Sequence, residues 1–569
     1  MKRSVLFLIL SALAAAGILY ALRRAAQTAP TAVSTLLPRK TIFVAHVPDF
    51  NQTRDRWHHS DIYALYREPA VQDFLRKPLA RLPKQDTTAQ TLREIEQLDP
   101  KDAFLALTSI DNDNPRFVGG FRFRGSQDAA ETIVGKWRAA LLEKNSNAKR
   151  EKSVYQQHQI ETIAAAPFAL STAYDGHWFF AASDVGELKA LLDRADRRSK
   201  DRQGTVEMNE SYRAAVTHMP SSYAMFFYLQ PKVFGEKLAA LRSAVAKPLP
   251  PEQRTMVEKM RAICGTTRFE NGKIHDVVFV GMPKLEHDAR LERSSLTLAT
   301  RDTFFYLATL LNLGQKIDAI NQTAGLGGRV QQLFQTLSGD GITADDWKAA
   351  FGLELGSLAD WAASARWPSF LLILPVKDAS KADQIVEAMT KVDEDATWTR
   401  TEKDGVRYLS MQSPASLIAI MPTIALSKRL LVVGLDQSSV EAVMKRAGNA
   451  ASDLSNSQTY KAAVRSVPEP TNFFTYIDTA LLYTRLDATL RPMLLMSAAF
   501  MPAVNNYVDS GKLPPPEVVT KHLGPIVSSQ RYDRDGYMAE SVGPVTLTQA
   551  AIGLGLPAAF WWVAYQRSQ

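Results

Sequence analysis

An internal repeat constrains this chain more than any other feature of its 569 residues. The segment Ser211–Val216, with the sequence SYRAAV, recurs as Thr459–Val464, with the sequence TYKAAV. Self-similarity over such a long period indicates that one folding unit occurs twice. We therefore expect two homologous lobes in tandem, repeat lobe one at residues 40–283 and repeat lobe two at residues 302–543.

Further matches extend the repeat along the body of the chain. They occur in the same order in both copies, which argues against chance similarity. Asn271-Gly272 and Asp535-Gly536 are favoured pairs for two-residue hairpin turns, so we expect these turns at equivalent places. The other matching pairs are Thr41/Thr303, Val71/Val330, Phe117/Phe370, Asp184/Asp436, Phe226/Phe474, Tyr228/Tyr476 and Pro250/Pro515.

Both copies show strand-like and helix-like periodicity in the same order. Runs of strands are interrupted by helices, without the regular strand–helix alternation of a doubly wound fold. This pattern is typical of an α+β fold of mainly antiparallel sheet with packed helices. The charged stretch that begins at Lys284 is expected to form a linker over residues 284–301.

The first 24 residues carry a membrane signal. Two basic residues follow Met1, and an uncharged run then extends from Val5 to Leu22. A basic start before an apolar run is typical of a signal peptide or a signal anchor. The run nearly reaches the length that spans a bilayer, which favours an uncleaved anchor helix. Cleavage near Ala14–Ala16 is the alternative, because small residues stand there.

A second apolar segment lies at residues 545–566. Trp561, Trp562 and Tyr565 stand near its end and precede Arg567, as in a helix that meets lipid headgroups. The segment is either a membrane span or a C-terminal helix that docks on the body. Together, the two ends predict a protein of the bacterial inner membrane whose body lies in the periplasm.

The composition excludes several kinds of site. The chain is 46% hydrophobic and 22% charged, within the range of globular proteins. Its single cysteine, Cys264, excludes an intramolecular disulfide and a cysteine zinc cluster. A net charge of +8 is a small excess for this length, so no nucleic-acid partner is expected.

The histidines near the start of the first copy form the one cluster that suggests a metal. His58 and His59 are adjacent, and adjacent side chains on a strand or helix point apart, so they do not easily share an ion. His46 lies upstream, and the matching place in the second copy has no histidine. The sequence also lacks the spacings of zinc proteases, phosphate loops and serine hydrolases. We therefore predict no catalytic, cofactor or metal site.

The second copy carries an additional segment around residues 491–510. Methionine-rich apolar surface adapts to different partners. Core packing is the ordinary alternative, but the first copy forms its core without this segment. We therefore expect the segment to lie at the junction between lobes or in an apolar pocket. The expected apolar contact residues are Met493, Leu494, Leu495, Met496, Phe500 and Met501.

The beginning of the first copy resembles a known family. Leu37–Thr41, Val47–Asp49 and Val71–Phe74 look like the opening of an uncharacterised bacterial envelope family, domain of unknown function 3352. The resemblance implies a bacterial protein with an exported body, and it supplies no catalytic residues. The basic pair Arg39-Lys40 departs from the family, where an acidic residue is expected.

These features predict a membrane-anchored, non-enzymatic binding or scaffold protein of the bacterial cell envelope. Its partners include the membrane, through the N-terminal helix and, if it spans, the C-terminal segment. One alternative is an accessory protein that shields an apolar ligand or a lipid. A hydrolase with an unrecognised site is another alternative.

Overall fold

A computed structural model gives the structure of the chain. It describes residues 31–80, 86–111, 114–144, 147–165, 168–197, 203–242, 257–284, 289–310, 328–392, 396–412, 421–447, 452–500 and 509–549. Runs of antiparallel strands are interrupted by helices, so the prediction of an α+β fold of antiparallel sheet with packed helices is confirmed.

The strands fall into two sets of ten. The first set is β1 (Phe43–Asp49), β2 (Lys101–Asp111), β3 (Asn114–Arg122), β4 (Lys149–Tyr155), β5 (His158–Ala165), β6 (Phe168–Asp175), β7 (Trp178–Ala182), β8 (Met225–Leu229), β9 (Ala262–Glu270) and β10 (Lys273–Gly281). The second set is β11 (Thr303–Leu310), β12 (Glu354–Asp360), β13 (Ser369–Pro375), β14 (Thr397–Lys403), β15 (Val406–Gln412), β16 (Thr423–Leu426), β17 (Leu430–Gly434), β18 (Phe473–Ile477), β19 (Ile526–Asp533) and β20 (Gly536–Gly543).

Helices connect these strands in both parts of the chain. Among the first ten strands are α2 (Thr31–Leu36), α3 (Phe50–His58), α4 (Asp61–Arg67), α5 (Pro69–Ala80), α6 (Asp86–Leu98), α7 (Gln127–Lys144), α8 (Val185–Arg197), η1 (Val206–Met208), α9 (Glu210–Val216) and α10 (Pro231–Arg242). Later in the chain are η2 (Ser294–Leu298), α13 (Gly328–Gly339), α14 (Ala344–Ala350), α15 (Ala379–Met389), α16 (Gln437–Arg446), α17 (Asp453–Asn456), α18 (Gln458–Val464), α19 (Thr479–Phe500), η4 (Ser510–Lys512) and α21 (Pro516–Thr520).

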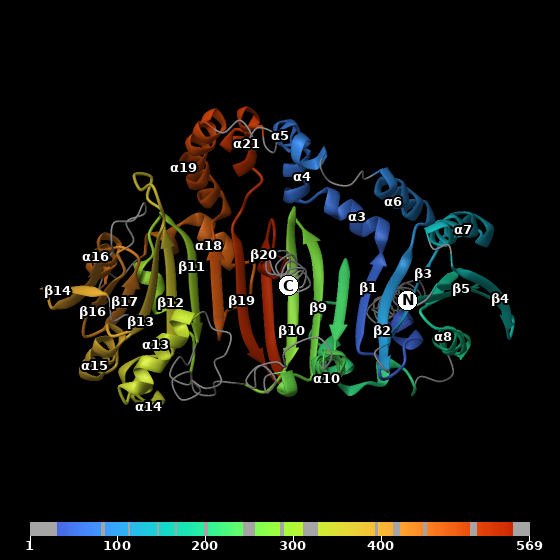
Figure 1. Cartoon of the computed structure of the whole chain (residues 1–569), viewed down its shortest axis with the longest axis horizontal. Helices are drawn as coiled ribbons and strands as arrows, with labels where there is room; N and C mark the ends of the chain where they lie inside the picture. Colours follow the sequence, from blue (N-terminus) through green and yellow to red (C-terminus); the bar gives the residue numbers. More distant parts are fainter. Residues whose placement is uncertain are drawn as a thin grey trace, which may run out of the picture.

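The twenty described strands form one open antiparallel sheet (Figure 1). The first half-sheet, β1–β10, has the order β4-β5-β6-β7-β3-β2-β1-β8-β9-β10. The second half-sheet, β11–β20, has the same order for its own strands, β14-β15-β16-β17-β13-β12-β11-β18-β19-β20. The two half-sheets meet where β10 pairs with β20, and this pair is called the seam below.

The register of pairing is also the same in both half-sheets. Val44 of β1 lies opposite Tyr228 of β8, and Tyr306 of β11 lies opposite Tyr476 of β18. At the seam, Val277 lies opposite Glu540.

The two halves are related by an approximate twofold rotation. When Figure 1 is rotated by 180° in its plane, α7 falls at the place of α15, α8 at that of α16 and α10 at that of α19.

The turn of the closing hairpin in the second half-sheet lies one residue earlier than the sequence alignment predicts. Asn271-Gly272 forms the first turn as expected, with φ angles of 51° and 78°. In the second hairpin Asp533 pairs with Gly536, so the turn is Arg534-Asp535, and the prediction of a turn at Asp535-Gly536 is wrong. Gly536 serves packing instead, because a Cβ there would lie 2.5 Å from the carbonyl oxygen of Val280.

The repeated SYRAAV and TYKAAV segments form α9 and α18, which pack aromatic rings on the sheet. Tyr212 meets Tyr228 edge to face, with ring centroids 4.9 Å apart. Tyr460 meets Tyr476 in the same way at 5.1 Å. All four rings are buried, and such pairs contribute about 0.5–1.5 kcal/mol beyond their buried area. This packing accounts for the similarity of the two segments.

Helices α10 and α19 lie at corresponding places in the two halves. Val233 and Phe234 of α10 pack near the buried Ile42. Leu481 and Leu482 of α19 pack near the buried Phe304. The described part of α10 has 12 residues and α19 has 22, so α19 continues well beyond its packed base.

The described part of the expected linker is packed onto the second half-sheet. Leu291, Leu298 and Ala299 belong to its core. The carboxylate of Glu354 accepts hydrogen bonds from the backbone N–H groups of residues 292–294. In the first half, α2 is buried in the corresponding core, so each folded half begins before the boundary that the repeat suggests.

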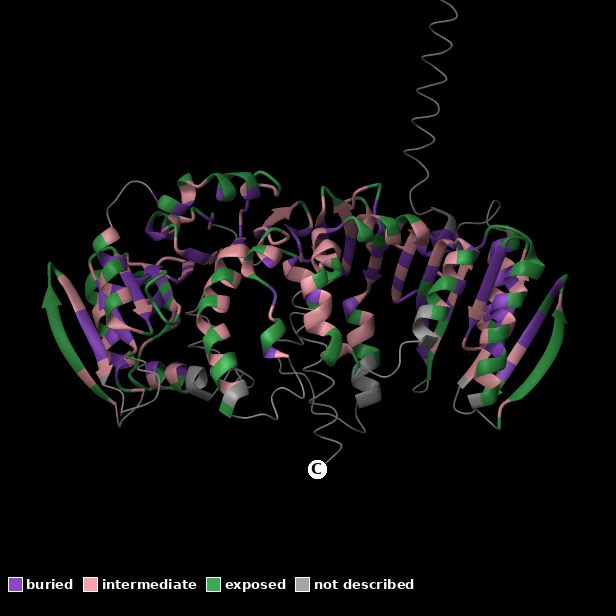
Figure 2. Ribbon diagram, turned by 90° about the horizontal axis from the view of Figure 1, so that it is seen from above, coloured by how far each residue is buried: buried purple, intermediate pink, exposed green. Residues whose placement is uncertain are grey.

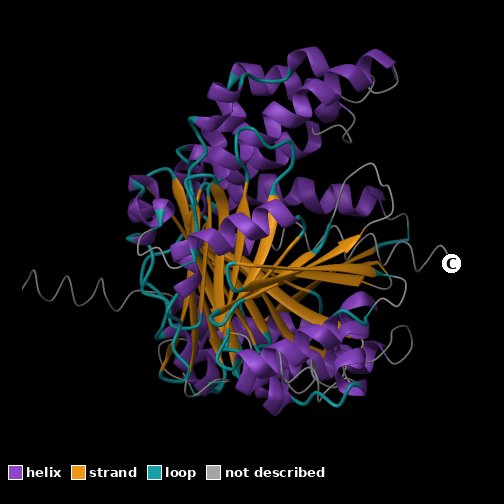
Figure 3. Ribbon diagram, turned by 90° about the vertical axis from the view of Figure 1, so that its left-hand side faces the viewer, coloured by secondary structure: helices purple, strands orange, loops and turns teal. Residues whose placement is uncertain are grey.

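The sheet forms an arch whose two ends bend toward the same side (Figure 2). The strands at these ends, β4 and β14, are largely exposed. Their charged side chains protect the open edges from pairing with other chains. Viewed along the arch, helices gather on both sides of the strands (Figure 3).

Both expected membrane segments fall largely outside the described residues. Residues 1–24 lie wholly outside them. Of the segment 545–566, residues 550–566 lie outside them. No helix within the described ranges combines the length and apolar character needed to cross a bilayer.

Candidate functional site

The apolar residues that the sequence singles out lie at the free end of α19. Leu495 is 47% exposed and Phe500 is 84% exposed. Met493 is half-buried, and Met501 lies outside the described residues. We call this surface the α19 tip. Its exposed apolar members are Leu494, Leu495, Met496 and Phe500.

A network around Arg491 holds the α19 tip in place. The Arg491 guanidinium donates hydrogen bonds to the Asp487 carboxylate one turn earlier, from Nη2 at 2.6 Å and from Nε at 3.0 and 3.1 Å. It also donates to the carbonyl oxygens of Leu513 and Pro514, at 3.2 and 2.6 Å. The hydrogen bonds with Asp487 raise the pKa of Arg491. The end of α19 is therefore fastened to the chain that leads into α21.

The segment around α21, at residues 509–522 of the second half, contacts α4 and α5 of the first half (Figure 1). We call α4, α5 and residues 509–522 the crest. Hydrogen bonds from Lys521 and His522 lower the pKa of Glu68. The polar contacts across the crest are the ion pairs Glu68–Lys521, Asp73–Lys512 and Lys77–Asp509, at 2.8, 3.0 and 3.6 Å, and a hydrogen bond between Glu68 and His522 at 2.7 Å.

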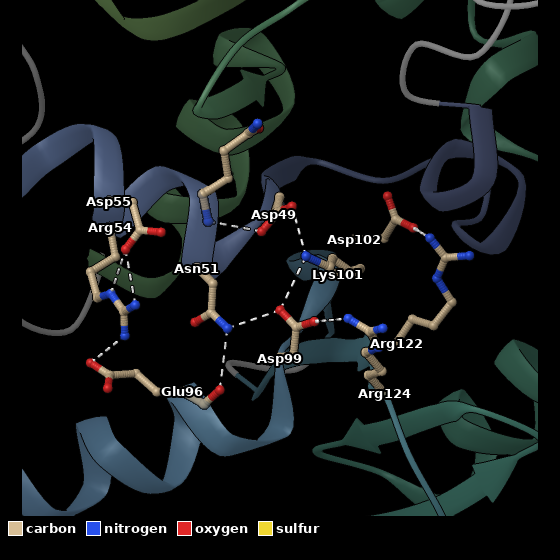
Figure 4. Close-up of polar contacts among 11 residues, drawn as sticks. Asp49, Asn51, Arg54, Asp55, Glu96, Asp99, Lys101, Asp102, Arg122 and Arg124 are labelled. Atoms are coloured by element: carbon tan, nitrogen blue, oxygen red, sulfur yellow. Dashed lines mark hydrogen bonds and ion pairs between the residues drawn. The ribbon is translucent and has the colours of Figure 1, made fainter.

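A second polar cluster joins α3 and α6 to the start of β2 (Figure 4). Asp49 caps α3 by accepting a hydrogen bond from Gln52 N–H at 2.9 Å. Lys101 contacts the carboxylates of Asp49 and Asp99 at 2.7 and 3.1 Å. Asn51 donates to Asp99 at 2.9 Å. The cluster thus ties the start of α3 and the end of α6 to the start of β2.

The electrostatics of this cluster favour the charged forms of its members. Burial raises the pKa of Asp49, but hydrogen bonds from Gln52 and Lys101 outweigh it and lower the pKa. Burial lowers the pKa of Lys101, but the hydrogen bonds to Asp49 and Asp99 outweigh this effect and raise the pKa. A lysine held in this way is a poor nucleophile or base, because both roles need the neutral amine. The cluster is therefore best understood as an anchor for α3 and α6.

The histidines flagged in the sequence lie in different environments. His46 is buried on β1, with Nδ1 3.0 Å from the Tyr223 hydroxyl and Nε2 3.7 Å from Asp102. His58 stacks on Tyr63 at the end of α3, with ring centroids 4.4 Å apart. The group of three metal-type ligands found among the described residues contains none of them. That group is His158, Asp175 and Asp196, whose ligand atoms lie within 4.8 Å of one another.

Cys264 lies on β9 within the core of the first half-sheet. It is fully buried, and burial raises the pKa of its thiol well above the usual range. Nucleophilic and metal-binding cysteines act as thiolates, so this environment does not favour either role.

Comparisons with known proteins give no functional lead. No protein-family model and no curated protein matches the chain. A solved structure described as crystal form III of TP0453 aligns with a TM-score of 0.26 and 8% identity, covering 45% of this chain and 81% of that chain. Crystal form I of TP0453 aligns with a TM-score of 0.25 and 7% identity, covering 45% and 80%. Likeness at this level supports no conclusion about fold or function.

Proposed function

We propose that the chain is an exported, membrane-anchored binding or scaffold protein of the bacterial cell envelope. The basic start and apolar run at residues 1–24 support the anchor and the periplasmic location of the body. The resemblance to domain of unknown function 3352 supports the same compartment. In this proposal the body presents a rigid surface to a partner, and it catalyses no reaction.

We further propose that residues 40–283 and 302–543 are two copies of one lobe that arose by duplication. The shared strand order, the shared register and the aromatic packing of α9 and α18 support this origin. Duplication followed by divergence explains why one feature, the extended end of α19, breaks the symmetry. A feature added to one copy alone is a natural place for a specific function.

The observation that carries the binding proposal is the exposed α19 tip. Large exposed apolar patches mark contact surfaces, and the α19 tip exposes four large apolar side chains within seven residues. Here the group stands on a helix that Arg491 fastens to the crest through the carbonyl oxygens of Leu513 and Pro514. A rigid apolar surface loses little conformational entropy on binding. We therefore place the contact surface at Leu494, Leu495, Met496 and Phe500.

Shielding of an apolar ligand or a lipid is the second candidate. The methionines and leucines of the α19 tip favour it, because flexible apolar side chains adapt to acyl chains as readily as to a protein.

Photocrosslinking in cells distinguishes these candidates. Phe500 is replaced by a photoreactive phenylalanine analogue, and Thr401, which is exposed on β14 far from the crest, is replaced in a matched control. We expect a discrete crosslinked product from position 500 and little from position 401. A protein adduct supports the scaffold role and a lipid adduct supports shielding. Equal, diffuse labelling at both positions would contradict a contact surface at the α19 tip.

Cell fractionation tests the location. We expect the chain to remain in membranes washed with alkaline carbonate, because an anchor helix resists that wash. We also expect added protease to degrade the body in spheroplasts. A carbonate-soluble protein that is protected in intact spheroplasts would contradict the exported, anchored body.

A further inference from the structure

A cavity of about 660 Å³ opens at the outer edge of the first half-sheet. Its lining residues come from α7, the β4–β5 hairpin and β6, and Figure 1 shows α7 next to β5 at this end of the sheet. Its volume is within the range of small-molecule sites. Its polar lining differs from the apolar core expected beneath a helix. The side chains used in the argument are Glu131, Arg138, Glu161, Thr172 and Tyr174.

Arg138 is the central polar group of this cavity. The residue is 7% exposed, which is unusual for an arginine. Its guanidinium pairs with Glu131 and donates to the Thr172 hydroxyl at 3.1 Å. Its Nε lies 3.5 Å from a carboxylate oxygen of Glu161 and has no hydrogen-bond partner within the described part of the chain. A buried arginine therefore lines the cavity, with one of its donors facing the Glu161 carboxylate.

The other charges of the cavity are balanced. Arg150 contacts both carboxylate oxygens of Glu161, with the Nε and Nη2 contacts at 2.8 and 2.9 Å. The Tyr174 hydroxyl donates to Glu131 at 2.9 Å, and burial together with this bond raises the pKa of Tyr174. Two arginines and two glutamates thus form a group with no net charge, and the two other charged lining residues, Asp128 and Lys152, have opposite signs.

The second half-sheet has an apolar core at the corresponding place. Glu161 pairs with Thr172 between β5 and β6, and the matching pair between β15 and β16 is Leu409 with Ile424. Tyr174 corresponds to Leu426 by the same register. These three apolar residues are buried beneath α13–α15.

The comparison shows that the fold does not require polar residues here. Buried ion pairs are often no more stabilising than apolar side chains of similar volume, because removing charges from water is costly. The first half nevertheless keeps an open, charge-balanced cavity where the second half has a closed core. We propose that this cavity is a binding site for a neutral, polyhydroxylated ligand of the carbohydrate class.

The chemistry of the lining selects this class. Each sugar hydroxyl both donates and accepts hydrogen bonds, so it can contact an arginine and a glutamate at once. Hydrogen bonds to charged groups are about twice as strong as those between neutral groups. An anionic or cationic ligand would disturb a group that is already neutral, and it would bury an uncompensated charge. A neutral ligand keeps the balance.

Binding is tested on the full chain in a detergent without a sugar head group. Saturation-transfer NMR with glucose, N-acetylglucosamine and maltose is compared with the same measurement on glutamate and inorganic phosphate. We expect transfer to at least one of the sugars and none to either anion. Absence of transfer to all three sugars at millimolar concentration, or transfer to the anions alone, overturns the proposal.

Variants locate the bound sugar. Glu161→Gln keeps the size of the side chain and removes the charge balance, so we expect at least tenfold weaker binding. The triple variant R138L/E161L/T172I gives the cavity apolar side chains like those of the second half, so it is expected to fold and to lose binding. Glu387→Gln breaks ion pairs on α15, the corresponding helix, and is expected to bind as the parent does. Undiminished binding by the folded triple variant overturns the site.

Discussion

Substitution of Glu354 gives a quantitative test of how residues 292–294 are held against the second half-sheet. This residue is buried at the start of β12 and accepts four hydrogen bonds. The donors are Glu292 N, Arg293 N, Ser294 N and Ser294 Oγ, at 2.8, 2.9, 2.7 and 3.0 Å. Arg293 is held with a φ of 57°, a conformation that is rare for a residue with a side chain.

The substitution Glu354→Ala leaves these donors without their acceptor. An unsatisfied buried donor costs about 1–3 kcal/mol, and water reaches some of them once the carboxylate is gone. We therefore expect the local free energy of opening to fall by about 3 kcal/mol. This loss corresponds to roughly a hundredfold faster amide exchange at residues 292–294, since each 1.4 kcal/mol is about a factor of ten.

Hydrogen exchange measured by mass spectrometry on the full chain checks this expectation. Glu354→Gln keeps one acceptor oxygen and should give an intermediate effect. Glu402→Ala, on the exposed face of β14, is a control and should leave the exchange of residues 292–294 unchanged. Unchanged exchange in Glu354→Ala would refute the reasoning, because the carboxylate would then not be what holds the segment.

Three further predictions follow from burial. The thiol of Cys264 should react with a thiol reagent only after denaturation, because burial raises its pKa and excludes the reagent. Phe474→Ala should destabilise the protein to urea by about 3–5 kcal/mol, whereas Leu495→Ala at the exposed α19 tip should change stability by less than about 0.5 kcal/mol. Burial also raises the pKa of Asp276, so the folded state holds this proton more tightly than the unfolded state does. Stability should therefore fall as the pH rises from about 4, and Asp276→Asn should remove that part of the pH dependence measured by urea titration.

Sequence patterns identified the features that depend on local chemistry. The aromatic residues of the repeat were visible because Tyr212 and Tyr460 make the same contacts in each half. The second hairpin turn was misplaced by one residue because Gly536 is needed for close packing against β10, a contact that local turn preference does not encode.

Long-range pairing was not visible in the sequence. β1 pairs with both β2 and β8, and nothing local in its seven residues specifies those partners. The seam joins strands that lie more than 250 residues apart, so tertiary packing alone selects it. The polar cavity was missed for the same reason. Arg138 and Glu161 meet only after α7 crosses β5, and the difference from Leu409 becomes informative only once the strand register is known.

A crosslink across the seam tests the central claim, that the two half-sheets form one continuous sheet. Val278 of β10 lies directly opposite Ala539 of β20, and opposed residues in antiparallel strands are close enough for a disulfide. Cysteines are placed at 278 and 539, with a control pair at 278 and 541, and the oxidised full chain is digested and analysed by mass spectrometry. The account predicts a disulfide between positions 278 and 539 and little between positions 278 and 541. Absence of the first link, or preference for the second, would contradict the seam and the continuous sheet with it.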